Sequence, residues 1–198
     1  MGKGDKPMNR KTFFKMFASL TGIAVVSAFV MSGVYQITKE PIAKAKDSQE
    51  LEAISEVVEE FDNDPFAEKT IITTPDKKHK LAFFPARKNG VINSFAIKTY
   101  SNNGFGGRIE MIVGFYIDGA IKNFKITEHQ ETPGLGSKAD ENKFKSQFDG
   151  FNPNKHIFKV KKDGGEIDGI TAATITSRAV IDAIQRAVDA YNNFNAGK

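Results

Sequence analysis

The chain has 198 residues and contains no cysteine. This absence excludes disulfide bonds, iron–sulfur clusters held by thiolates, and haem attached through a Cys-x-x-Cys-His motif. Histidine is also scarce, and the three residues His79, His129 and His156 do not have the spacing of metal ligands. No built-in metal site is therefore expected, and any redox chemistry would need an organic cofactor.

A concentration of basic charge suited to nucleic acid is lacking too. The formal net charge is +4, and much of this excess lies in residues 1–15. That segment has one acid, Asp5, against Lys3, Lys6, Arg10, Lys11 and Lys15. Domains that bind nucleic acid usually carry clustered Lys and Arg on one face. The rest of the chain is nearly balanced in charge, so nucleic acid is not an expected partner.

One long stretch lacks charge altogether: residues 16–37 read MFASLTGIAVVSAFVMSGVYQI. About 20 apolar residues cross the hydrocarbon core of a bilayer as a helix, so this stretch is expected to be a single transmembrane helix. Lys and Arg favour the cytoplasmic side, and they precede the stretch. We therefore expect the basic N-terminus, residues 1–15, in the cytoplasm. The rest of the chain is expected on the periplasmic or outer side of the cell (inner) membrane, with Tyr35 as an interfacial anchor.

A cleaved signal peptide is the competing interpretation of the same stretch. The apolar core of a signal peptide is shorter, about 7–15 residues, and ends near a small-residue cleavage site. No convincing Ala-x-Ala-like site occurs around Ser27–Gly33. The retained helix is therefore favoured.

Residues 38–80 are expected to form a stalk or packing helix and a connection. The apolar side chains in this segment recur at helical spacing, at Leu51, Ile54, Val57, Val58 and Phe61. The sequence Asn63-Asp64-Pro65 is expected to end this helix, and a charged turn follows at residues 76–80.

Residues 81–198 are expected to form one domain, which begins with a β-rich region. Strands are predicted around Leu81–Phe84, Asn93–Tyr100, Ile109–Ile117 and Ala120–Thr127. Asp118-Gly119 between the last two is a strong hairpin signal, with positive φ expected at both residues. The glycine-rich run from Gly104 to Gly107 indicates a loop or a close approach of the backbone, although most such runs are only turns.

The remaining elements are mainly helical. A helix over Glu141–Phe148 and a short strand over His156–Val160 are expected. The last helix is the clearest, because its apolar positions share one face: Val180, Ile184, Ala187, Val188 and Tyr191. The order of elements predicts an α+β fold, with an antiparallel-rich sheet and flanking helices after the transmembrane helix.

The stretch DGITAATITS, residues 168–177, opens this last helix. A helix N-terminus presents free N–H groups and the positive end of the helix dipole, so it binds anions such as phosphate. Ala172 and Ala173 leave room for a ligand. The hydroxyl groups offer more donors than one helix cap needs: Thr171, Thr174, Thr176 and Ser177. A cap and a phosphate site explain these residues equally well, and Asp168 would repel a phosphate while suiting backbone amides or Mg²⁺.

A second loop, ETPGLG at residues 131–136, follows the predicted hairpin. Pro-Gly favours a type II turn, and Gly134 and Gly136 can expose backbone N–H groups. Leu135 would stand in an exposed turn, which suits the face and edge of a flat heterocycle. Taken alone, a plain turn with one buried leucine explains this loop better.

These two loops and the hairpin VGFYIDGAIKNFKITEH resemble the FMN-binding domain of RnfG, a component of Rnf-type electron-transport complexes. The related NqrC component of the Na⁺-translocating NADH:quinone reductase shares this domain but is usually longer, so the Rnf assignment is preferred. The resemblance covers most of the chain, including the apolar stretch and QITKEPIAKA beyond it. It identifies residues 81–198 as the FMN-binding domain.

In this family the motif Asp-x-x-[Ser/Thr]-Gly-Ala-Thr carries FMN through a phosphoester to its last Thr. The matching residues here run from Asp168 to Thr174, so the resemblance implies covalent FMN at Thr174. Ala172 replaces the usual Gly, which puts the local turn geometry in doubt. Thr132 and Leu135 would be the nearest contacts of the flavin ring. The other implied cofactor contacts are Glu131, Gly134, Gly136, Thr171, Ala172, Ala173, Thr176 and Ser177.

The resemblance implies a membrane-anchored electron-carrier subunit of an ion-translocating oxidoreductase that turns over no substrate by itself. Its complex would couple electron transfer between ferredoxin and NAD to Na⁺ or H⁺ translocation. The implied partners are the other membrane and redox subunits, and a Mg²⁺-dependent flavin transferase that recognises Asp168 during maturation. Two alternatives remain: an anchored extracytoplasmic binding module without a redox cofactor, and a stand-alone anchored flavoprotein.

Overall fold

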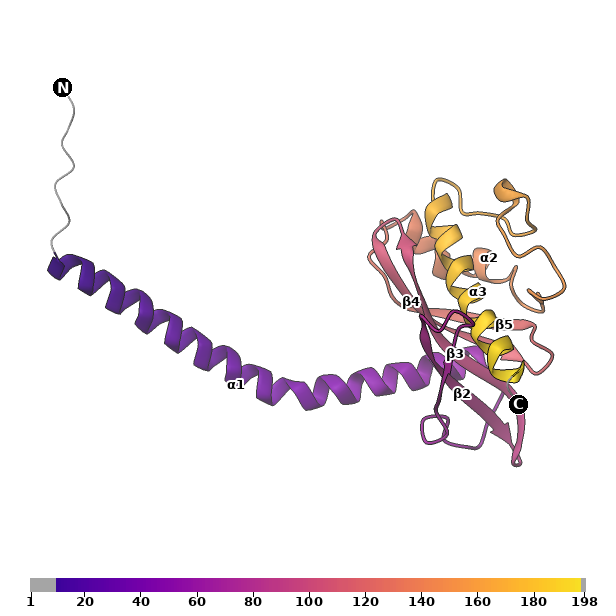
Figure 1. The fold of residues 1–198 in the computed structure, drawn as a ribbon, viewed down its shortest axis with the longest axis horizontal. Helices are drawn as coiled ribbons and strands as arrows, with labels where there is room; N and C mark the ends of the chain where they lie inside the picture. The colour runs from indigo at the N-terminus through magenta and orange to yellow at the C-terminus, as the bar shows by residue number, and fades with distance from the viewer. Residues whose placement is uncertain (1–9, 197–198) are drawn as a thin grey trace, which may run out of the picture. The chain divides into compact units, whose positions relative to one another are not determined.

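The computed structural model describes residues 10–196 (Figure 1). Residues 1–9 of the expected basic N-terminal segment, and residues 197–198 of the expected domain, lie outside this range. The chain divides into two compact units, residues 1–49 and 50–198. The second unit therefore includes part of the segment 38–80 that was expected to be a stalk.

The described part of the first unit belongs to helix α1, which spans Arg10–Val57 and continues into the second unit. All side chains from residue 16 to residue 37 are exposed, and the helix is long and apolar enough to cross a membrane. Pro41 lies inside α1. The predicted packing helix is thus the end of the same helix, and it stops at Val57, before the expected stop at residues 63–65.

The second unit is built on one five-stranded antiparallel sheet with the order β1-β2-β3-β4-β5. The strands are β1 (Thr70–Thr73), β2 (Lys80–Lys88), β3 (Val91–Gly104), β4 (Gly107–Tyr116) and β5 (Ile121–Glu128). The four strands predicted in the β-rich region are confirmed as β2 to β5, and their bounds are longer or slightly shifted. Strand β1 was not predicted. Because every strand pairs with the next one in sequence, all connections between strands are short.

The helices after the sheet are α2 (Asn142–Lys145) and α3 (Thr174–Ala196), with 3-10 turns at Gly136–Asp140 and Lys161–Asp163. Only one turn of the helix expected over 141–148 forms. The prediction of a strand at 156–160 is wrong, because in the described chain Val160 makes only an isolated bridge to Ile167.

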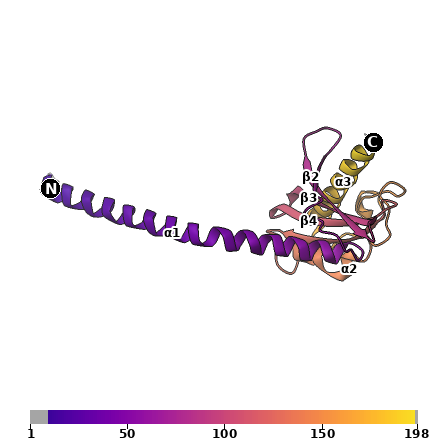
Figure 2. The same cartoon turned by 90° about the horizontal axis from the view of Figure 1, so that it is seen from below.

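Helix α3 and the end of α1 lie on opposite faces of the sheet (Figure 2), and the two faces carry different cores. Helix α3 packs on one face, where its apolar stripe meets the aromatic side chains of Phe83, Phe95 and Phe115. The last turns of α1 pack on the other face, where Ile54 is fully buried. The alternation of side chains along a strand supplies both cores, and the predicted stripe of α3 is confirmed.

Gly114 allows the end of α1 to approach β4 closely. A Cβ atom at this position would overlap the carbonyl oxygen of Val57. The contact is reinforced from β5, since the Lys122 ammonium donates to the carbonyl of Val58 at 2.6 Å. The end of α1 is therefore an integral part of the second unit.

The β4–β5 hairpin is confirmed, but its turn differs from the one predicted. Only Gly119 has a positive φ, of 82°, and its N–H donates to the carbonyl of Tyr116 at 3.0 Å. The N–H of Tyr116 donates to the carbonyl of Ala120 at 2.8 Å, so the loop closed by this pair comprises residues 117–119 and ends in one left-handed glycine, a common alternative to the two-residue turn. Overall, the predicted α+β class, with a long N-terminal helix and an antiparallel sheet, is confirmed.

Candidate functional site

The start of α3 lies at one end of the second unit and leaves several backbone donors open. The N–H groups of Thr174, Ile175 and Thr176 have no carbonyl acceptor among the described residues. The first turn of any helix has this property, and the helix dipole adds positive potential there. This end of α3 can therefore accept an anionic group.

The three hydroxyl groups of this turn differ in availability. Thr176 is 1% exposed, and its hydroxyl donates to Oε2 of Glu131 at 2.5 Å. The buried hydroxyl of Ser177 donates to the carbonyl of Ala173 at 3.0 Å and accepts from the N–H of Ile170 at 2.9 Å. Thr174 is half-buried and its hydroxyl bonds to no other described residue. Among the three, only the Thr174 hydroxyl is left without a hydrogen bond to the described protein.

The loop 131–136 lies against this turn. The N–H of Leu135 donates to the carbonyl of Thr132 at 3.2 Å, and Gly134 has φ of +75°. These values fit the type II turn predicted from Pro-Gly. The N–H of Gly134 donates to the hydroxyl of Ser137 at 2.9 Å and is therefore already occupied, while Leu135 is exposed.

The tip of the β3–β4 hairpin forms a third wall. Phe105 and Gly106 form the turn, and the N–H of Gly106 donates to Oε1 of Glu131 at 3.0 Å. A Cβ atom on Gly106 would overlap the carbonyl of Gln130, so the close approach predicted for this glycine run does occur. The Phe105 side chain is 69% exposed.

These three segments enclose a cavity of about 290 Å³. Its lining comprises Phe105, Glu131, Thr132, Leu135, Gly136, Ala172, Ala173, Thr174, Ile175 and Thr176. The two loops singled out in the sequence thus meet in one site. Most ligand pockets have volumes of about 300–1,000 Å³, so a large ligand would remain partly outside, against the exposed side chains of Phe105, Leu135 and Ile175.

A second cavity, of about 410 Å³, lies beside the first half of the DGITAAT motif. It is lined by Lys138, Glu141, Lys143, Phe144, Gln147, Asp168, Gly169, Ile170 and Thr171. Asp168 is exposed and pairs with Lys161 at 2.8 Å. The structure therefore divides the candidate residues between two cavities: Asp168 and Thr171 line the larger one, and Thr174 the smaller one.

The motif loop is fixed at several points along its length. The Gln147 amide accepts from the N–H of Asp168 at 2.7 Å and donates to its carbonyl at 3.2 Å. Farther on, Arg178 of α3 forms two hydrogen bonds with the Asp163 carboxylate, at 2.7 and 2.6 Å. The hydrogen bond from Arg178 is the main cause that lowers the pKa of Asp163.

Ala172 has a backbone conformation that is unusual for alanine. Ala172 has φ of +62°, in the left-handed region where glycine is preferred and other residues are strained. The loop keeps the geometry that a glycine would adopt there, and alanine is accommodated at a cost in stability.

Phe105 and Ile175 also line the cavity, although neither was predicted as a site residue. Phe105 lies in the turn of a glycine-rich run, and Ile175 lies between two threonines. Exposed apolar side chains beside polar loops are the signal that could have found them. Among the described residues, no group of three or more His, Asp or Glu side chains could hold a metal ion.

Comparisons with known proteins agree with these features. The family model of the FMN-binding domain matches residues 104–189, and the model of the RnfG N-terminal region matches residues 8–57. The G subunit of the ion-translocating oxidoreductase complex of Vibrio cholerae serotype O1 is 33% identical over 183 residues, covering 87% of each chain. The protein of the same name from Aliivibrio fischeri is 33% identical over 191 residues, covering 91% of this chain and 90% of the relative.

Two solved structures are similar at lower identity. The C subunit of the Na⁺-translocating NADH-quinone reductase from Parabacteroides distasonis has 22% identity and a TM-score of 0.48, covering 69% of this chain and 72% of that chain. The NqrC protein of Shewanella oneidensis has 22% identity and a TM-score of 0.49, covering 67% and 72%.

Proposed function

The chain belongs to the RnfG family, the G subunits of ion-translocating oxidoreductase complexes, and we propose that it carries FMN bonded through the phosphate to Thr174. It is a membrane-anchored, FMN-binding electron-transfer subunit of such a complex. The observation that carries the covalent assignment is that Thr174 lines the cavity at a helix N-terminus and that its hydroxyl has no partner among the described residues.

The residues of the 290 Å³ cavity suit FMN in two respects. A phosphate ester on Thr174 would accept hydrogen bonds from the open N–H groups at the start of α3. The flavin ring would rest against the exposed apolar side chains of Phe105, Leu135 and Ile175. When bound, FMN supplies the ability to accept and release electrons one at a time, and the protein supplies its position and surroundings.

Competing attachment points are already engaged. The Thr176 hydroxyl donates to Glu131, and the Ser177 hydroxyl bridges Ile170 and Ala173. Thr171 is exposed and lines the other cavity. Thr132 also lines the smaller cavity, but it lies in the loop 131–136 and not at the helix N-terminus. Of the hydroxyls in the stretch 168–177, only that of Thr174 belongs to a residue that lines this cavity and is unpaired among the described residues.

We propose that the N-terminus lies in the cytoplasm and the FMN-binding domain on the periplasmic or outer side. The support is the positive-inside tendency, since five Lys or Arg residues and one acid precede the uncharged stretch 16–37. Attachment by a covalent bond suits this location, because a lost cofactor could not be replaced there from the cytoplasm.

In this proposal the chain receives and passes on electrons within a complex that couples ferredoxin and NAD to the movement of Na⁺ or H⁺. It turns over no substrate alone. A Mg²⁺-dependent flavin transferase attaches FMN, and the exposed carboxylate of Asp168, which pairs with Lys161 while Gln147 holds the Asp168 backbone, is part of what that enzyme recognises.

The test is to express the full-length chain with a flavin transferase and to measure flavin fluorescence of the denatured band on a gel. Thr174→Ala should give a dark band while the protein remains folded and in the membrane. Thr176→Ala is the matched control and should keep the fluorescence. Fluorescence that persists in Thr174→Ala would contradict the assignment to Thr174, and a dark wild-type band with an active transferase would contradict covalent attachment of FMN.

A further inference from the structure

Glu131 presents a buried carboxylate to the 290 Å³ cavity. The residue is 6% exposed. Its Oε2 accepts from the hydroxyl of Thr176 at 2.5 Å, and its Oε1 accepts from the N–H of Gly106 at 3.0 Å. A carboxylate can accept hydrogen bonds on both oxygens, and each oxygen of Glu131 has one such partner.

No cation neutralises this carboxylate at close range within the described chain. None of the ion pairs between described residues includes Glu131. Its own N–H donates to Nδ1 of His129 at 3.1 Å, which directs the ring nitrogen to the backbone and not to the carboxylate. A buried charge without an ion partner depends on its hydrogen bonds.

Glycines make the room for this side chain. A Cβ atom on Gly136 would lie 2.5 Å from Oε2 of Glu131 and 2.9 Å from the hydroxyl of Thr176. A Cβ atom on Gly104 would lie 2.6 Å from Oε1. Gly104 at the end of β3 and Gly136 in the loop 131–136 both leave space for the Glu131 carboxylate. The carboxylate therefore fits between the hairpin tip, the loop 131–136 and the start of α3.

We propose that Glu131 is a positioning residue that holds the three walls of the cavity together and sets the reduction potential of the flavin through its charge. The inference rests on the proposed function, because it requires the flavin to occupy this cavity. A fixed negative charge disfavours the addition of an electron nearby. Glu131 therefore lowers the flavin potential relative to a neutral side chain of the same shape.

The experiment compares midpoint potentials of the flavin-loaded full-length protein by spectroelectrochemical titration. Glu131→Gln removes the charge and keeps the size, and we expect the flavin to become easier to reduce by about tenfold, or about 59 mV for one electron. Glu128→Gln is the matched control, since this exposed residue of the same segment does not line the cavity, and its potential should equal that of the wild type.

A second pair of variants separates charge from position. Glu131→Asp keeps the charge but shortens its reach, so the apo-protein should melt at a lower temperature while the potential stays closer to wild type than in Glu131→Gln. Thr176→Val removes one donor and leaves the charge less compensated, so the potential should fall. This variant also serves if Glu131→Gln does not fold.

An unchanged potential in Glu131→Gln, or an unchanged or raised potential in Thr176→Val, overturns the proposed role of Glu131. Either result would be obtained on protein that carries flavin at Thr174, so it would leave the proposed function intact. A wild-type chain that carries no flavin would instead contradict the proposed function itself.

Discussion

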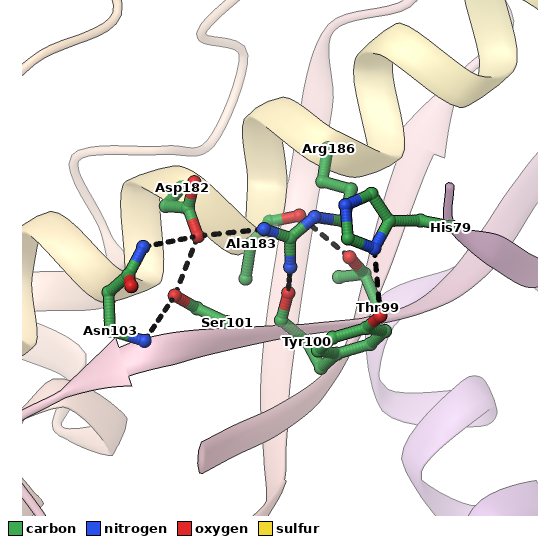
Figure 3. Close-up of polar contacts among 8 residues, drawn as sticks. All are labelled: His79, Thr99, Tyr100, Ser101, Asn103, Asp182, Ala183 and Arg186. Atoms are coloured by element: carbon green, nitrogen blue, oxygen red, sulfur yellow. Dashed lines mark hydrogen bonds and ion pairs between the residues drawn. The ribbon is translucent and has the colours of Figure 1, made fainter. Parts of the chain in front are cut away.

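The beginning and the middle of α3 differ in how completely their polar groups are paired. In the middle, the Asp182 carboxylate accepts from the hydroxyl of Ser101 at 2.6 Å, from Asn103 at 3.4 Å and from Arg186 at 3.1 Å (Figure 3). The Arg186 guanidinium also donates to the carbonyl of Tyr100. This cluster ties the helix to β3 and leaves its charged groups satisfied.

At the beginning of the same helix, eight residues before Asp182, the hydroxyl of Thr174 and the first N–H groups have no partner in the described protein. Ile175 is exposed, and the preceding Ala172 has a strained backbone. Buried polar groups are normally hydrogen-bonded, and strain persists where function requires it. The difference fits the proposal that the middle of α3 is scaffold and that its beginning binds the cofactor.

Among the variants that test this difference between the two parts of α3, Gly136→Ala is expected to have the largest effect on stability and flavin loading. The added methyl group would lie 2.5 Å from Oε2 of Glu131 and 2.8 Å from its Cβ, so the loop or the carboxylate must move. Overpacking of this kind costs about 1–3 kcal/mol, and we expect the free energy of unfolding to fall by about 3 kcal/mol and flavin loading to drop. Chemical denaturation and flavin absorbance measure the two effects.

The control for this variant is Gly169→Ala, where a new Cβ would meet its nearest neighbour, the Ser177 hydroxyl, at 3.7 Å. Ordinary contact distances predict a change in stability within about 0.5 kcal/mol. An equal loss in both variants would show that the crowding around Glu131 is not the cause.

A smaller effect is expected from Asp182→Ala, in the paired part of the helix. Three donors lose their common acceptor, and hydrogen bonds to charged groups are worth about 1.5–3 kcal/mol each at most. Because Asp182 is partly exposed, we expect a loss of about 2 kcal/mol in the free energy of unfolding. Flavin attachment should be retained, and a loss of attachment without unfolding would break the distinction between scaffold and site.

Ala172→Gly should increase stability by a smaller amount. Relief of the left-handed alanine is worth about 1–2 kcal/mol, partly offset by the greater chain entropy of glycine, so a gain of about 0.5–1 kcal/mol is expected. The matched variant Ala173→Gly changes a buried position without positive φ and should destabilise. Thermal melting of both variants measures the change in stability. A loss of stability in Ala172→Gly would contradict the proposal that Ala172 is strained.

The smallest effect concerns acid stability. The hydrogen bond from Arg178 lowers the pKa of Asp163 below its ordinary value of 3.8. A carboxyl with a lowered pKa in the folded protein contributes stability above its ordinary pKa, and this contribution is lost as the pH falls through the folded pKa. Stability should therefore decline below about pH 4, and Asp163→Asn should flatten that decline. If the stability of Asp163→Asn depends on pH in the same way as that of the wild type, the Asp163–Arg178 pair does not contribute to acid stability.

The motifs allowed the pairing of the loops 131–136 and 168–177 to be predicted, because their residue types carry the chemistry of a known family. The β4–β5 hairpin was predictable from Asp118-Gly119, but its turn type was not, since local sequence allows both a two-residue and a three-residue loop. The short β1 escaped prediction because its four residues gain their stability from pairing with β2.

The division of the motif between two cavities could not be predicted either. The Gln147 amide holds the backbone of Asp168 at the start of the motif, and this residue is distant in sequence and carries no motif signal. The contacts of the Glu131 carboxylate could not be predicted for a similar reason, since its partners Gly106 and Thr176 come from a hairpin and a helix. Sequence patterns identify the elements, whereas the contacts between elements decide which hydroxyl is free.

The most direct test of the account is a crystal structure of the full-length protein loaded with flavin. We predict continuous density from the Thr174 side chain through the phosphate to a ring that lies in the 290 Å³ cavity against Phe105 and Leu135. A ring in the larger cavity beside Asp168 and Thr171, or a phosphate joined to another hydroxyl, would contradict it.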